Sequence, residues 1–148
     1  MKNKIFKTNN DLTGLVIRMT VGLVLFPHGA QKMLGTFGGY GYKGTMHFFT
    51  DTMHLPWLIS FLIIIIEFVG ALSLLFGFAS RIWSLCILVL MVGVILTSHV
   101  EYGFFMNWFG QQKGEGYEFH LLMIGLCLAL IFNGSGRYSA DNLLTSKA

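Results

Sequence analysis

Charged side chains are scarce in this chain. Only 11% of its 148 residues are Asp, Glu, Lys or Arg, whereas 54% are hydrophobic. A soluble domain usually carries about 25% charged residues. So few charges cannot cover a water-facing surface, and the composition therefore indicates a membrane protein. The 18 glycines agree with this, because Gly is more frequent in membrane helices than in soluble ones.

Several classes of site lack the residues they require. Both cysteines, Cys86 and Cys127, lie in apolar runs, and the chain has no CxxC pair. This disfavours a disulfide framework, a metal site and a thioredoxin-like redox pair, so no metal is expected. A Gly-rich dinucleotide fingerprint and a Lys/Arg cluster are also missing. We therefore expect neither a nucleotide cofactor nor a nucleic-acid partner.

Four apolar runs each approach the ~20 residues needed to cross the hydrocarbon core. They cover about residues 12–34, 56–79, 82–99 and 119–132. Because lipid cannot satisfy backbone polar groups, we expect each run to be a helix. The predicted fold is all-α, a polytopic membrane protein with a four-transmembrane-helix bundle, forming one domain over residues 1–148. A short interfacial helix is expected in the first outer loop, at about residues 45–54.

The distribution of Lys and Arg predicts the orientation, since these residues favour the cytoplasmic side. With the N-terminus inside, the outer side holds only Lys43 and Lys113, with Lys32 at the boundary, and the inner side holds Lys2, Lys4, Lys7, Arg81, Arg137 and Lys147. Both termini are therefore expected in the cytoplasm. The basic start resembles a signal peptide, but the run is long and no small-residue cleavage site follows, so we expect a retained span.

Ionisable groups inside the spans are costly in hydrocarbon and are therefore candidates for function. At ~1.5 Å per residue, Arg18 lies ~9 Å from the inner end, Glu67 ~18 Å and His28 ~24 Å. Arg18 and Lys32 share one stripe of the first helix with small glycines, so we expect this stripe to face the bundle. We predict catalytic roles for Glu67, His28 and Arg18.

A second group of polar residues gathers near the outer boundary. Besides His28, three helices contribute Lys32, His99, Glu118 and His120. Convergence of titratable groups on one pocket is typical of a binding or proton-handling site. We predict that these four residues bind a cofactor.

Structural interpretations stay open for the same residues. Arg18 and Glu67 would then form an ion pair that fixes helix register, and Lys32 would extend to the headgroups. The histidines would be structural or interfacial, and Glu118 would be a favourable acid in the first turn of its helix. The loop aromatics would form an interfacial belt.

Several segments, in order, resemble the DoxX family. They are RMTVGLVLFPHGAQK at residues 18–32, FGG at 37–39, EFVGAL at 67–72, the His that closes the third span, YEFHLL at 117–122 and GSGRYSAD at 134–141. The resemblance covers about residues 12–144. It implies a small four-helix protein of the bacterial inner membrane, linked to oxidoreductase complexes, thiosulfate:quinone oxidoreduction and defence against oxidants and quinones. The family's recurring polar positions match Arg18, His28, Lys32, Glu67, His99 and Glu118.

Two functions are compatible with these features. The first is a quinone-linked membrane oxidoreductase or its membrane subunit: His28 and Lys32 would donate to the quinone oxygens and Glu67 would carry a proton, with Arg18 adjusting its acidity. Electrons would come from a partner subunit or a small reductant. The second is a non-enzymatic scaffold or a transporter of a small solute or protons, which would act as a homodimer through its glycine-lined faces. A haem between His28 and His99 or His120 is disfavoured, because no matched pair lies at one depth.

Overall fold

The structure, a computed structural model, describes residues 6–145, and within them every regular element is a helix. The first long helix is α2 (Leu12–Leu34). The second is a continuous rod of α4 (Trp57–Ile65), the π-helical η2 (Ile66–Gly70) and α5 (Ala71–Phe76). The third combines α6 (Ser80–Val94), the π-helical η3 (Ile95–His99) and the 3-10 turn η4 (Val100–Tyr102). The fourth is α7 (Glu118–Asn133).

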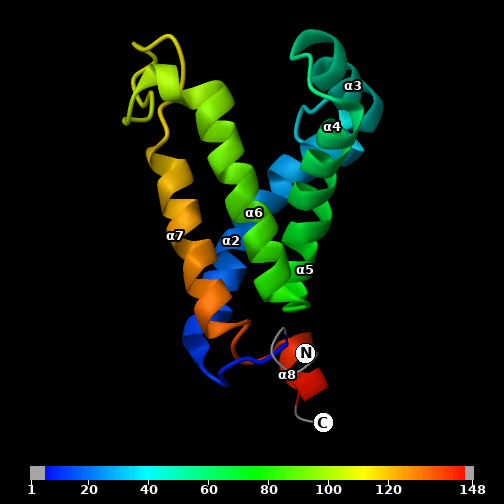
Figure 1. The fold of residues 1–148 in the computed structure, drawn as a ribbon, viewed down its shortest axis with the longest axis vertical. Coiled ribbons are helices and arrows are strands. Elements are labelled where there is room, and N and C mark those ends of the chain that lie inside the picture. Colours follow the sequence, from blue (N-terminus) through cyan, green and yellow to red (C-terminus); the bar gives the residue numbers. More distant parts are fainter. Residues whose placement is uncertain (1–5, 146–148) are drawn as a thin grey trace.

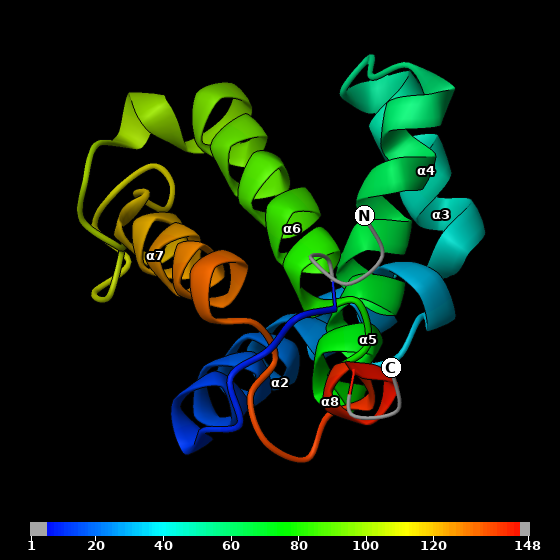
Figure 2. The same cartoon turned by 60° about the horizontal axis from the view of Figure 1, so that its bottom comes forward.

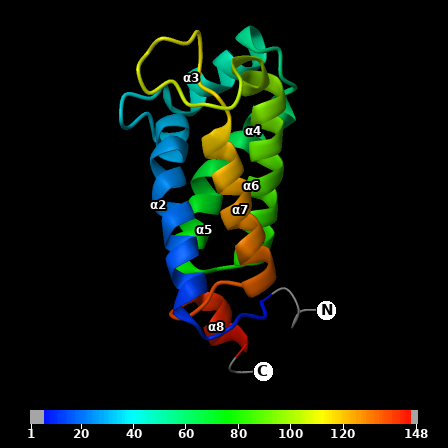
Figure 3. The ribbon, with the colours of Figure 1, turned by 90° about the vertical axis from the view of Figure 1, so that its left-hand side faces the viewer.

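The first three of these rods are long and apolar enough to cross a membrane, with 23, 20 and 23 residues. Helix α7 is apolar but has 16 residues, which at ~1.5 Å each falls short of the ~30 Å core. The predicted all-α, polytopic membrane fold is confirmed. Figure 3 shows the four rods running side by side.

The predicted helix in the first outer loop is present, but it begins earlier than expected. Helix α3 (Gly41–His47) is continued by the π-helical η1 (Phe48–Thr52). Its buried Met46 and Phe49 pack with Ile64 in a small cluster of their own. This contact anchors the loop to the second rod.

The main core lies where the rods meet, and its buried residues include Val21, Leu25, Ile87, Met91 and Cys127. From this core the α6–α7 pair and the second rod diverge toward the end that carries the long loops, with α2 crossing behind them (Figure 1). The second rod ends at Gly77, whose φ of 66° permits the left-handed turn into α6.

The opposite end is closed by the short helix α8 (Ala140–Thr145) and the described start of the chain (Figure 2). The buried carboxylate of Asp141 accepts hydrogen bonds from the backbone N–H groups of Ala79 (2.7 Å) and Ser80 (3.0 Å), and so caps α6. Gly14 and Gly136 approach so closely that a Cβ on Gly14 would lie 2.6 Å from the Gly136 nitrogen. The GSGRYSAD segment therefore has a structural role at this end.

Candidate functional site

Lys32 and Glu67 form an ion pair between α2 and the second rod. The Lys32 Nζ lies 2.5 Å from Glu67 Oε2, and the two side chains are 25% and 8% exposed. The pair is possible because the helices touch at Gly29, where a Cβ would come within 2.6 Å of the Glu67 carbonyl. Glu67 lies in a π-helical turn, a local geometry that is frequent at functional sites. A buried carboxylate is thus held beside a part-exposed ammonium.

Arg18 does not form the ion pair with Glu67 that the structural interpretation of these residues would require, because Glu67 pairs with Lys32. Its side chain is 2% exposed and donates to five backbone carbonyl oxygens. Two belong to the end of α5, Leu74 (3.0 Å) and Leu75 (2.5 Å), and the others belong to Ser135, Arg137 and Tyr138. A guanidinium has five N–H donors, so all are used. Arg18 ties the C-terminal segment to the ends of two rods, and all its carbonyl partners lie away from Glu67.

His28 lies on the exposed side of α2. Among the described residues it has no hydrogen-bond or ion-pair partner. The buried face of α2 instead carries Arg18, Gly22, Leu25 and Gly29. His28 therefore lies outside the buried face of α2, and its catalytic role remains only a prediction.

His99 and His120 meet where α6 and α7 approach the long loop that joins them. Their ring centroids lie 4.3 Å apart at 40°. The Nδ1 of His99 is 2.7 Å from the Glu115 carbonyl oxygen. The Nδ1 of His120 is buried without a hydrogen-bond partner in the described structure, which is uncommon for a buried polar atom. Direct ring contact leaves no room for a haem between these two histidines.

Glu118 stands at the start of α7 and organises the loop before it. Its Oε1 accepts hydrogen bonds from the Met106 backbone N–H (3.0 Å) and from Trp108 Nε1 (3.3 Å). Glu118, the expected acid in the first turn of α7, therefore also holds the preceding aromatic loop through two hydrogen bonds.

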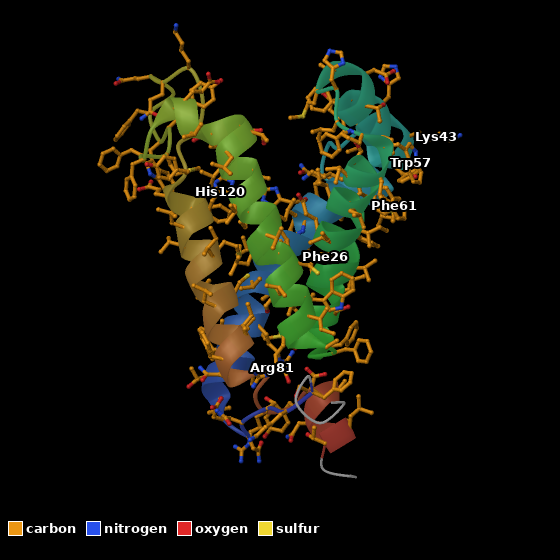
Figure 4. All side chains as sticks on the ribbon, viewed as in Figure 1. Phe26, Lys43, Trp57, Phe61, Arg81 and His120 are labelled. Atoms are coloured by element: carbon orange, nitrogen blue, oxygen red, sulfur yellow. The ribbon has the colours of Figure 1, made fainter. Side chains whose placement is uncertain are left out.

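The four residues predicted to bind a cofactor thus belong to two groups and not to one pocket. Lys32 pairs with Glu67 between α2 and η2, whereas His99, His120 and Glu118 belong to the α6–α7 arm. Figure 4 shows His120 on that arm, across from Phe26, which lies with α2 near the second rod. Within residues 6–145 no three His, Cys, Asp or Glu side chains are placed to hold a metal ion.

An apolar cleft, which no motif of the sequence indicates, opens between the second rod and α6. Its cavity volume is about 500 Å³. One wall contains Ile63 and Ile66, and the other contains Cys86, Gly93 and Thr97. Nothing lies within 4 Å of a Cβ built on Gly93, so this glycine leaves open space in the wall. Gly93, in the middle of an apolar run, is the one sequence feature that points to the cleft, but such a glycine is equally typical of close helix packing.

Comparison with known proteins agrees with this architecture. The model of the DoxX family matches residues 13–100, more than half of the chain. A Bacillus subtilis (strain 168) protein named "Putative oxidoreductase CatD" is 28% identical over 120 residues, covering 81% of this chain and 79% of the relative. An Escherichia coli (strain K12) protein named "Inner membrane protein YqjF" is 29% identical over 141 residues, covering 95% and 98%. No solved structure gives a significant match. The chain is a membrane protein of the DoxX family.

Proposed function

We propose that this protein is a quinone-linked oxidoreductase of the bacterial inner membrane, acting alone or as the membrane subunit of a complex. The observation that carries the proposal is the apolar cleft, whose wall at Ile63 and Ile66 is formed by the same helical turns that hold Glu67. The name of the Bacillus subtilis relative supports redox chemistry. The name of the Escherichia coli relative supports the location, and the Lys/Arg bias supports cytoplasmic termini.

The cleft has the size and character that a quinone requires. Ligand sites are commonly 300–1,000 Å³ and mostly apolar, with few polar groups. Here about 500 Å³ is lined by aliphatic side chains, with the Thr97 hydroxyl and the Cys86 thiol as the polar exceptions. Since both walls belong to membrane-spanning rods, an isoprenoid tail would reach the cleft from the lipid without crossing water.

Reduction of a quinone to a quinol takes up two electrons and two protons. The chain lacks the usual motifs for an electron carrier, so the electrons would come from a partner subunit or a reductant of the thiosulfate class. Two thiosulfate ions release two electrons when an S–S bond joins them. The Lys32–Glu67 pair would pass the protons, because Lys32 is part-exposed while Glu67 is buried and directly follows Ile66 of the cleft wall along the chain.

Two glycines allow a direct test of the cleft. Gly93 lines it and Gly125 lies on α7 outside it, and a Cβ at either position meets nothing within 4 Å. Gly93→Leu should fill the cleft, because its Cβ enters open space, whereas Gly125→Leu is the matched control. Purified protein in nanodiscs should bind and, with thiosulfate or a co-purified reductase, reduce a short-tail quinone.

We expect Gly93→Leu to lose quinone binding, and Gly125→Leu to retain it. Glu67→Gln should bind quinone but reduce it more slowly. Equal quinone binding by both leucine variants would exclude the cleft. A protein that binds no quinone but co-purifies with a soluble reductase would instead be a scaffold.

A further inference from the structure

The loop between η4 and α7 is ordered by hydrogen bonds within it and at its base. Asn107 holds it from within: its backbone N–H donates to Glu115 Oε2 (2.7 Å), and its side chain exchanges hydrogen bonds with the Gln112 backbone at 3.0 and 2.9 Å. At its base, the Tyr117 N–H donates to the Gly103 carbonyl at 3.2 Å and the Glu118 N–H to the Phe104 carbonyl at 2.9 Å. The loop is therefore fixed on the end of α7.

This loop and α7 line an open pocket with a volume of about 450 Å³. The loop contributes Phe104 and Trp108, and α7 contributes Glu118, Leu121 and Leu122. Phe104 is held by edge contact with the Tyr117 ring, at a centroid distance of 5.8 Å. Trp108 is held through its indole N–H on Glu118. Each ring thus has one contact that orients it, while Phe104 and Trp108 are 45% and 79% exposed.

Glu118 is the charged residue of the pocket lining, and one of its oxygens is available. Both hydrogen bonds that it receives end on Oε1, and no described residue donates to Oε2. Lys113, the basic residue of the loop, does not line the pocket. The pocket therefore presents a carboxylate oxygen and aromatic faces without a neutralising cation.

We propose that this pocket binds an amphipathic organic cation, an ammonium group on an apolar chain. Aromatic faces attract ammonium groups electrostatically, most strongly where water is partly excluded. The Glu118 carboxylate would add a charge-assisted contact. Leu121 and Leu122 are 44% and 71% exposed beside the pocket, so the apolar chain would continue along α7 toward lipid. An anionic ligand would meet repulsion from Glu118.

The inference does not depend on the proposed quinone chemistry, because the pocket lies on the α6–α7 arm and its test contains no quinone. Purified protein in maltoside micelles is titrated with decyltrimethylammonium below its micelle-forming concentration, and tryptophan fluorescence is recorded. Decyl alcohol and decyl sulfate are the neutral and anionic comparisons. Trp108→Phe identifies the signal from the pocket, since Trp57 and Trp83 lie outside it.

Glu118→Gln is the decisive variant, because the amide oxygen can still accept from Met106 and Trp108 while the charge is removed. We expect it to weaken binding of the cation by about tenfold or more. Glu101→Gln, an exposed acid on the preceding turn, should leave binding unchanged. Equal affinity in the wild type and Glu118→Gln would overturn the proposal, as would equal binding of the alcohol or sulfate.

The ammonium group could belong to a lipid headgroup or to a free amphiphile, and nanodiscs separate these sources. Protein in phosphatidylglycerol nanodiscs is compared with protein in nanodiscs that also contain phosphatidylethanolamine. Competition by phosphatidylethanolamine against decyltrimethylammonium would support the site and identify a lipid amine as the occupant. Binding of the probe without such competition would support the site and indicate a free amine.

Discussion

Replacement of Arg18 by Lys tests whether this buried cation is structural. The guanidinium makes five hydrogen bonds to backbone carbonyls. An ammonium has three donors, so at least two bonds are lost. At a net 1.5–3 kcal/mol per bond to a charged group, the free energy of unfolding should fall by about 3–6 kcal/mol. For a chain of this size that lowers Tm by about 6–24 °C.

Arg81→Lys is the matched control. Arg81 donates to three backbone carbonyls, those of Lys7, Ile131 and Phe132, which an ammonium can match in number. We therefore expect a smaller fall in Tm than for Arg18→Lys, measured by thermal unfolding in one detergent. An unchanged Tm in Arg18→Lys, or an equal fall in both variants, would refute the structural role. Loss of activity at unchanged stability would restore the catalytic interpretation.

Three further predictions concern the contacts between rods. Gly29→Ala should destabilise the protein by about 1–3 kcal/mol, because its Cβ would lie 2.6 Å from the Glu67 backbone. Gly93→Ala is the control and should be tolerated, because its Cβ meets nothing within 4 Å. The unfolding midpoints of the two variants are compared. Asp141→Ala should cost about 0.5–2 kcal/mol by removing the cap of α6, and a Tm equal to that of the wild type would contradict the cap. Lys32→Met alone should lower the free energy of unfolding more than Lys32→Met combined with Glu67→Gln, because the single variant leaves a buried carboxylate unpaired. Additive losses in this double-mutant cycle would argue against the ion pair.

Much of the fold could be predicted because each span depends on its own residues. The first span was predicted at residues 12–34, where α2 is found, and the fourth differs from α7 by one residue at each end. The predicted start of the helix in the first long loop is less accurate, since the helix begins at Gly41 and the prediction places its start at residue 45. Its start depends on contacts of the loop with the second rod, which the local pattern does not contain.

The amino-acid sequence by itself determined that this chain is a helical membrane protein, because hydrocarbon rewards apolar runs and requires internally bonded backbone. It also indicated that Arg18 and Glu67 are buried, since unpaired charge in lipid is costly. Only the tertiary structure decided their partners. The close approach of the helices at Gly29 lets Lys32 form an ion pair with Glu67. The C-terminal segment packs back against α2, and its backbone carbonyls accept hydrogen bonds from Arg18. The cleft exists because two rods diverge, which is a property of their crossing and of neither rod alone.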